Sequence, residues 1–393
     1  MSGAPDPFTR AADGLLILDG VLLPVSGRCV RLAIRDDKIE ALPDCPGPPR
    51  WVCLPPLVDK HVHACRAYSL AGHRQPRSLE DGIRLLDSAL AQLTAADFCD
   101  RSLRLFHQAL ANGSTGLRTH TDVSVATGLR AVEGVCTARE QAGGSMNIEI
   151  VAFATAGSDP AEKTVQDHLR AAVGQGADLL GAVPDFYTDP QRSVDALLEL
   201  AGELDVDVDL HLDEHLDVSA MLSETVSRAV LRHDYCGRVT LSHGCVLSVL
   251  EDTRRREVID GLAEAGITVI ALPHTNLYLQ DRDSGPVPRR RGLTAVNDLI
   301  RAGVPVRIAS DNVRDPVYPF GNADLLEAAW LAVITGHLLD TAAIIAAVCD
   351  GRTEVTAGAG ADLVLIPAAD LNEALASRGG RRVVVTAGRP GPF

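Results

Sequence analysis

The chain has 393 residues, 46% of them hydrophobic, and its 52 acidic and 37 basic residues give a formal net charge of −15. This negative surplus argues against nucleic acid and against a membrane surface as partners, because both require a positive protein surface. No stretch approaches the ~18 apolar residues of a membrane-spanning helix, and residues 1–10 lack the apolar run of a signal peptide. Nine cysteines without a Cys-x-x-Cys pair favour buried free thiols in a reducing compartment. We therefore expect a cytoplasmic protein.

Both ends of the chain have the short apolar runs and turn residues that are typical of β-strands. The predicted strands cover residues 15–23, 29–41, 361–367 and 381–388. Neither end carries enough apolar surface to fold alone. We expect residues 1–53 and 355–393 to pair into one small β-sandwich side domain.

Eight apolar runs with helical segments between them fill the centre of the chain. The runs cover residues 51–59, 117–123, 147–155, 179–185, 206–214, 238–244, 267–274 and 304–312. Helical periodicity appears in residues 85–93, 106–112, 161–173, 194–204 and 254–265. Eight alternating units of strands buried on both faces predict a (β/α)8 TIM-like barrel over residues 54–354. The alternative is an open doubly wound sheet, which would bring fewer strands and a Gly-x-Gly-x-x-Gly turn.

Polar residues gather at the ends of these runs, where barrel enzymes carry their catalytic groups. The first run is followed by His61 and His63, whose i and i+2 spacing in an extended chain lets both imidazoles face one point. Neutral imidazole is a good ligand for zinc or iron. A structural pair held by hydrogen bonds is the alternative reading.

Three further runs end in groups of the same kind. The fifth run carries His211, with Glu214 three residues later, and we interpret Asp213 and His215 as loop residues. The sixth ends in Ser242-His243 and the eighth in Ser310-Asp311-Asn312. A metal ion held by three or four such ligands can lower the pKa of a water molecule from 15.7 to roughly 7. A carboxylate can then move the proton to a departing nitrogen, while a second polar group steadies the hydroxide.

Seven segments together resemble the cytosine deaminase branch of the amidohydrolase superfamily, which is related to the N-isopropylammelide amidohydrolases. They are His61-Val62-His63, Arg118-Thr119-His120-x-Asp122-Val123, His211-x-x-Glu214, Ser242-His243, Leu279-Gln280-x-Arg282, Arg290-Arg291-Gly292 and Ser310-Asp311-Asn312-x-x-Asp315-Pro316. The similarity runs in register from about Leu15 to Pro367, which is nearly the whole chain.

The resemblance implies a role for each matching residue. The implied ligands of one zinc or iron(II) ion are His61, His63, His211 and Asp311. Glu214 would be the proton shuttle, and His243 would position the attacking hydroxide, so that both are catalytic together with Asp311. Gln280 would contact the substrate after the seventh strand. The fourth run ends without a lysine that could bridge two metals, which agrees with a single ion, and by analogy the protein is a possible homo-oligomer.

Three positions depart from the pattern of the branch. Thr155 stands where a glutamine reads the pyrimidine edge, Asn312 where a second aspartate follows the metal ligand, and Val317 where an aromatic residue is usual. The turn after His63, Ala64-Cys65-Arg66, is also unusual. A site built to hydrogen-bond one heterocycle edge rejects analogues that leave its polar groups unpaired. We therefore expect these substrate-contacting positions to select a ring other than cytosine.

Three hypotheses for the function follow. The first is hydrolytic deamination of a small amino-substituted nitrogen heterocycle, in which Glu214 moves the protons and ammonia is released. The second is an amidohydrolase that opens a cyclic amide or removes a substituted amine. Asn312 and Thr155 are the residues that support this second hypothesis. The third is a binding protein that has kept the barrel but has lost catalysis.

Overall fold

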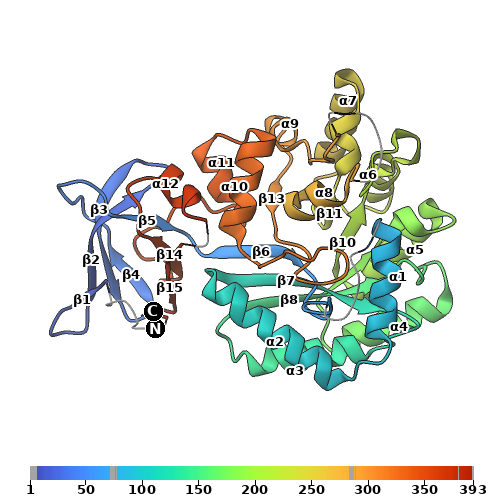
Figure 1. The fold of residues 1–393 in the computed structure, drawn as a ribbon, viewed down its shortest axis with the longest axis horizontal. Helices are drawn as coiled ribbons and strands as arrows, with labels where there is room; N and C mark the ends of the chain where they lie inside the picture. The colour runs from blue at the N-terminus through green and yellow to red at the C-terminus, as the bar shows by residue number, and fades with distance from the viewer. Residues whose placement is uncertain are drawn as a thin grey trace.

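The computed structural model describes residues 7–70, 76, 78–282, 287, 289–378 and 380–391. Their strands form two separate sheets: one combines strands from both ends of the chain, and the other holds the central strands (Figure 1). We call them the side sheet and the barrel sheet.

The barrel sheet holds eight parallel strands that are hydrogen-bonded in chain order. They are β6 (Leu57–Val62), β7 (Ser114–Val123), β8 (Asn147–Ala154), β9 (Leu179–Ala182), β10 (Asp207–Leu212), β11 (Val239–His243), β12 (Thr268–Ala271) and β13 (Val306–Ile308). The sheet closes through a parallel bridge between Val62 and Asp311, where the Asp311 amide donates to the His61 carbonyl at 2.8 Å. The predicted (β/α)8 barrel is confirmed, and its closing contact lies beside the predicted metal ligands.

Helices connect the barrel strands and lie around the outside of the barrel (Figure 1). The α-helices are α1 (Leu79–Leu90), α2 (Ala95–Ala111), α3 (Arg130–Gln141), α4 (Lys163–Gly174), α5 (Pro190–Leu204), α6 (Ser223–Arg232), α7 (Asp252–Glu264), α8 (Pro273–Leu279), α9 (Val296–Arg301), α10 (Leu325–Gly336), α11 (Thr341–Val348) and α12 (Leu371–Ala376). Short 3-10 helices cover η1 (Pro184–Phe186), η2 (Val218–Ala220) and η3 (Cys245–Val249).

The pair α2 and α3 illustrates how the sequence sets these helices. A capping box starts α2: Thr94 Oγ1 accepts from the Asp97 amide, and Asp97 Oδ2 accepts from the Thr94 amide at 2.8 Å. The buried face of α2 includes Phe98. Gly134 of α3 packs closely against this face, since a Cβ atom there would lie 2.6 Å from the Phe98 Cβ. The small residue therefore permits the close approach of the two helices.

The side sheet joins the two ends of the chain. Its strands are β1 (Thr9–Arg10), β2 (Leu16–Leu23), β3 (Arg28–Arg35), β4 (Lys38–Ala41), β5 (Trp51–Leu54), β14 (Leu363–Ile366), β15 (Val383–Thr386) and β16 (Arg389–Pro390). The two ends meet in the antiparallel pair of β14 with β5 and in an antiparallel bridge between Lys38 and Gly360. A hydrophobic cluster of its own, which includes Val21, Leu32 and Val385, is buried against this sheet. The predicted side domain of both ends is thus present as a sheet, while its boundaries at residues 53 and 355 stay a prediction.

Several predicted strands are wrong in extent: the run 179–185 is a strand only to Ala182, and in the run 304–312 only Val306–Ile308 is a strand. Two further runs differ because of prolines. The run 51–59 is not one barrel strand, because it covers β5 of the side sheet and the first part of β6 of the barrel. Pro55 and Pro56 separate the two strands, since proline has no N–H to donate to a sheet. The run 267–274 ends as a strand at Ala271, and Pro273 opens α8 instead.

Two expectations from composition can be compared with the structure. Within the described residues, no helix has both the length and the apolar character needed to cross a bilayer. All nine cysteines are free, but only five of them are buried, whereas the sequence led us to expect buried free thiols.

Candidate active site

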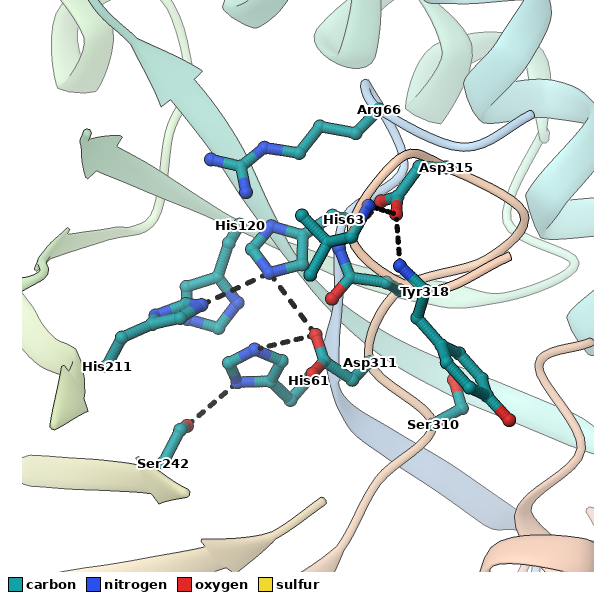
Figure 2. A network of polar contacts seen from close by, with 12 residues as sticks. His61, His63, Arg66, His120, His211, Ser242, Ser310, Asp311, Asp315 and Tyr318 are labelled. Carbon is teal, nitrogen blue, oxygen red and sulfur yellow. Dashed lines mark hydrogen bonds and ion pairs between the residues drawn. The ribbon is translucent and has the colours of Figure 1, made fainter. Parts of the chain in front are cut away.

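The four predicted metal ligands converge at the carboxyl ends of the barrel strands (Figure 2). Asp311 Oδ1 lies 3.5 Å from His61 Nε2 and 3.4 Å from His63 Nε2. The Nε2 atoms of His63 and His211 are 3.1 Å apart. Donors bound at ~2.0–2.1 Å to one tetrahedral ion lie roughly 3.3 Å from one another. The pairs His61–Asp311, His63–Asp311 and His63–His211 therefore lie at the spacing that donors to a single small cation require.

The burial and protonation of these groups also fit a metal ion. His61 Nε2 and both carboxylate oxygens of Asp311 are buried without a hydrogen-bond partner among the described residues. Burial lowers the pKa of His63 and His211 well below the usual value, so their rings are neutral, which is the ligating form. Burial alone would raise the pKa of Asp311, but its interactions with His61 and His63 hold it well below the usual value. Neutral imidazoles with one carboxylate suit zinc or iron.

A hydrogen-bond network of polar groups supports His61 on the side of its Nδ1 atom. Ser242 Oγ lies 2.8 Å from His61 Nδ1 and donates to Asp209 Oδ1 at 3.3 Å. Asp209 also accepts from Arg118 Nη1 at 2.9 Å and lies 3.2 Å from His120 Nε2. Because Ser242 donates its proton to Asp209, its lone pair accepts from His61 Nδ1–H. This contact selects the tautomer that leaves the His61 Nε2 lone pair facing the other donors.

A second buried carboxylate holds the segment that carries Asp311. Asp59 accepts from the Ser310 hydroxyl at 2.5 Å and from the Ser310 amide at 3.2 Å, and burial raises its pKa to about 6. Asp311 itself has φ of 62°, and His243 has φ of 76°. Residues other than glycine seldom adopt this left-handed region, and such strain often lies at functional sites.

Glu214 and His243 lie next to the ligand cluster. Glu214 Oε1 is 3.6 Å from His243 Nδ1, and both side chains are buried. Burial, together with the charges of Asp311 and Asp185, raises the pKa of Glu214 well above the usual value. Burial lowers the pKa of His243 to about 4, and its Nδ1 lies 3.1 Å from Asn276 Oδ1. A carboxyl group with a raised pKa beside a neutral imidazole is an arrangement suited to proton transfer.

Three of the four predicted substrate contacts line the cavity above these groups. Thr155, Asn312 and Val317 line it together with Glu214, His243 and three of the four predicted ligands, His63, His211 and Asp311. The hydroxyl of Thr155 lies 3.5 Å from that of Ser158, and the Asn312 amide donates to Asp315 at 2.6 Å. The remaining lining is largely apolar, with Leu79, Ile83, Leu86, Phe153, Val183 and Phe186.

The fourth predicted contact, Gln280, lies elsewhere. Its amide donates to the backbone carbonyl of Glu214 at 2.9 Å, and the residue borders a neighbouring hollow that Glu214 also lines. The structure therefore places Gln280 behind the Glu214 loop. Asp213 accepts from the backbone amides of Leu222 and Ser223 at the start of α6, at 2.7 and 3.1 Å. This agrees with our interpretation of Asp213 as a loop residue.

The sequence reasoning assigned no role to Asp209, His120 and Arg66. Asp209 precedes His211 by two residues on β10, and this spacing could have indicated that both side chains face the barrel interior. Arg66 lines the cavity and pairs with Asp122. Asp122 belongs to a segment quoted for the family resemblance, whereas Arg66 belongs to the turn that departs from it. Their partners come from other strands, so the sequence alone did not show what they contact.

Comparison with known proteins gives one family. The pattern described as the amidohydrolase family matches residues 137–386. A pterin deaminase of Rhizobium rhizogenes (strain K84 / ATCC BAA-868) is 33% identical over 353 residues, which cover 85% of this chain and 79% of that protein.

Solved structures agree with the fold. The N-isopropylammelide isopropylaminohydrolase of Burkholderia multivorans has a TM-score of 0.79 at 28% identity, with 96% of this chain and 97% of that chain covered. The 5-methylcytosine deaminase of Klebsiella pneumoniae has a TM-score of 0.85 with 95% and 96% covered, and at 23% identity it supports the fold alone.

Proposed function

This chain belongs to the amidohydrolase family, and we propose that it is a metal-dependent deaminase of a small amino-substituted nitrogen heterocycle. The observation that carries the proposal is the buried carboxylate of Glu214, which lies 3.6 Å from His243 beside four converging donor groups. A relative that is 33% identical is a pterin deaminase, which supports the reaction type.

We assign one divalent ion, zinc or iron(II), to the donors of His61, His63, His211 and Asp311. When bound, the ion supplies the Lewis acidity that makes water a nucleophile near neutral pH. The protein contributes preorganisation: Ser242 sets the tautomer of His61, and Asp59 holds the Ser310-Asp311 segment. Elemental analysis of the purified protein decides between zinc and iron.

Glu214 is the proton carrier in this proposal. Its carboxylate takes a proton from the attacking water, gives it to a ring nitrogen, and moves a second proton to the departing amine, so that ammonia leaves. The raised pKa of Glu214 suits this cycle, because a carboxyl group with an ordinary pKa would be a poor proton donor near pH 7.

His243 orients the attacking water. Asn276 Oδ1, at 3.1 Å, accepts the proton of His243 Nδ1, and Nε2 is left with a lone pair that accepts from the water. With its pKa lowered to about 4 by burial, the ring is neutral at physiological pH. A neutral ring costs less in this dry site than a charged one and leaves the proton transfers to Glu214.

The residues that line the cavity are of the kind that bind a flat ring. Phe153, Val183, Phe186 and Val317 supply apolar walls, and a few polar groups lie among them. Such a lining is typical of sites for small heterocyclic ligands. Phe153 also packs on His211, with ring centroids 4.4 Å apart, so the wall and the ligand cluster support each other.

The test is ammonia release from a panel of aminopteridines, aminopyrimidines and aminotriazines. Glu214→Gln should lower kcat by roughly 10²–10⁴, the usual contribution of a general acid or base, without changing the metal content. Glu264→Gln, at the exposed end of α7, is the matched control and should leave kcat unchanged. A metal-loaded wild-type protein that releases no ammonia from any member of the panel would contradict the proposal.

Removal of a substituted amine is a second candidate, favoured by the 28% identical N-isopropylammelide isopropylaminohydrolase and by Asn312. The released molecule distinguishes the two: an alkylamine in place of ammonia from an N-alkylated triazine would favour this candidate. Opening of a cyclic amide would instead add the mass of water to the substrate.

A further inference from the structure

Arg66 presents a guanidinium group to the cavity that the proposed reaction does not use. The residue follows His63 in the turn after β6 and is only 8% exposed. Its Nε donates to Asp122 Oδ1 at 2.8 Å, and its Nη2 lies 2.7 Å from the same oxygen. Its Cζ lies 5.4 Å from the centre of the Phe153 ring, and the side chain extends above the histidine cluster in Figure 2. Arg66 is therefore held rigidly at the cavity wall.

The second terminal nitrogen of Arg66, Nη1, has no hydrogen-bond acceptor among the residues that the structure describes. Burial opposes the charge, but Asp122 outweighs it and raises the pKa of Arg66, so the guanidinium stays charged. Two other polar groups of the wall are engaged: the Asn312 amide donates to Asp315 at 2.6 Å, and the Thr155 hydroxyl lies 3.5 Å from that of Ser158. A charged donor on a dry wall is costly unless an acceptor meets it.

We propose that Arg66, positioned by Asp122, is a specificity-determining residue that donates to a carbonyl oxygen of the substrate ring and so selects oxo-substituted heterocycles over their diamino analogues. This inference rests on the proposed function, because it concerns the same cavity. Arg66 and Thr155 line the same cavity, and in this proposal Arg66 recognises the ring carbonyl.

The charge balance favours a neutral carbonyl oxygen over a carboxylate. Asp122 already neutralises Arg66, and Asp87, Glu214 and Asp311 line the same cavity. A ligand carboxylate would add negative charge to this wall, whereas a ring carbonyl needs only the free N–H of the guanidinium. An amino group at that position would offer a donor to a donor, and the pair would remain unsatisfied.

Equilibrium binding tests the inference without requiring turnover. To prevent hydrolysis of the diamino compounds, the Arg66 variants are made in the metal-loaded Glu214→Gln protein. Each protein is titrated by calorimetry with 2,4-dioxopteridine and 2,4-diaminopteridine, and in parallel with uracil and 2,4-diaminopyrimidine. Arg66→Met should weaken binding of the preferred dioxo compound by roughly ten- to a hundredfold, the loss expected for one hydrogen bond to a charged group. Affinity for the diamino analogue should change less than about threefold, so that the variant loses most of the preference for the dioxo compound over the diamino compound.

Three further variants separate recognition from structure. Arg66→Lys keeps the charge without the planar fork and should retain part of the preference. Asp122→Asn should lower the same preference, because the guanidinium loses its fixed orientation. Arg101→Met is the matched control: Arg101 donates to the Ala67 carbonyl of the same turn at 3.0 Å but does not line the cavity, so its variant should bind like the wild type.

The outcomes distinguish this inference from the proposed function. Equal weakening of dioxo and diamino compounds by Arg66→Met would show a structural role and overturn the inference, as would unchanged binding. A wild-type enzyme that binds neither dioxo compound would also overturn it. If no amino-heterocycle yields ammonia and Arg66→Met still abolishes the preference, the proposed deamination fails while the assignment of Arg66 stands.

Discussion

Replacing Ser242 with alanine should weaken metal binding without touching any proposed ligand. Ser242 Oγ is fully buried and bridges His61 Nδ1, at 2.8 Å, to Asp209 Oδ1, at 3.3 Å. Without the hydroxyl, Asp209 keeps Arg118 and His120, but His61 Nδ1–H is left without its acceptor. An unsatisfied buried donor costs about 1–3 kcal/mol.

The expected magnitude follows from this single contact. Loss of the partner that orients a metal-bound histidine weakens the metal site by roughly 10–100-fold. At about 1.4 kcal/mol for each factor of ten, this corresponds to about 1.4–2.8 kcal/mol, which matches the cost of one unsatisfied donor. We therefore expect the dissociation constant for zinc to rise by one to two orders of magnitude in Ser242→Ala.

Competition with a chromophoric chelator measures this change. The matched control is Ser102→Ala on α2, because Ser102 is fully buried but its hydroxyl has no hydrogen-bond partner among the described residues. Its zinc affinity should equal that of the wild type. Ser242→Thr retains a hydroxyl and should retain most of the affinity. If Ser242→Ala folds and binds zinc within twofold of the wild type, the proposed support of His61 is refuted.

Three further predictions concern pH, metal and packing. Burial raises the pKa of Glu214, and the charges of Asp311 and Asp185 add to this rise. Because Glu214 loses its ionised form as the pH falls, Asp185→Asn should lower its pKa and move the acid limb of the kcat/KM profile to lower pH. A shift of the acid limb to higher pH would contradict this. Chelation should abolish ammonia release and lower Tm, since a ligand at 100 times its Kd adds about 2.7 kcal/mol to stability; added zinc or iron(II) should restore both. Gly134→Ala should destabilise the protein by about 1–3 kcal/mol through overlap with the Ala95 carbonyl and Phe98. Gly174→Ala in α4 meets no atom within 4 Å and should not lower Tm in thermal denaturation, because alanine favours a helix over glycine.

Residue type and spacing were sufficient to predict site residues that lie on one strand or directly after it. His61 and His63 were paired because alternate residues of an extended chain face the same side, and the structure brings their Nε2 atoms to 3.5 and 3.4 Å from Asp311. The position of Glu214 three residues beyond His211 indicated a carboxylate near the same cluster, and its side chain lies 3.6 Å from His243.

The same rules failed where backbone hydrogen bonding or loop conformation decides the outcome. The run 51–59 was read as one strand, but two adjacent prolines break it and send β5 and β6 to different sheets. Gln280 lies outside the cavity that the other three predicted contacts line, and its amide donates to the Glu214 carbonyl at 2.9 Å, while its role as a substrate contact stays a prediction. A side chain in a loop can hydrogen-bond to any of several backbone groups, and the spacing of residues in the sequence does not predict which group is nearest.

The sequence by itself determined the class of fold and the kind of donors, because apolar periodicity and residue chemistry are properties of short segments. Only the tertiary structure decided which partners each donor has. Barrel closure joins Val62 to Asp311 and thereby brings together residues 250 positions apart in the chain, such as His61 and Asp311 (311 − 61 = 250). The contacts of Arg66 with Asp122 and of Ser242 with His61 depend on the register between strands. That register arises from packing of the whole barrel, which no single segment encodes.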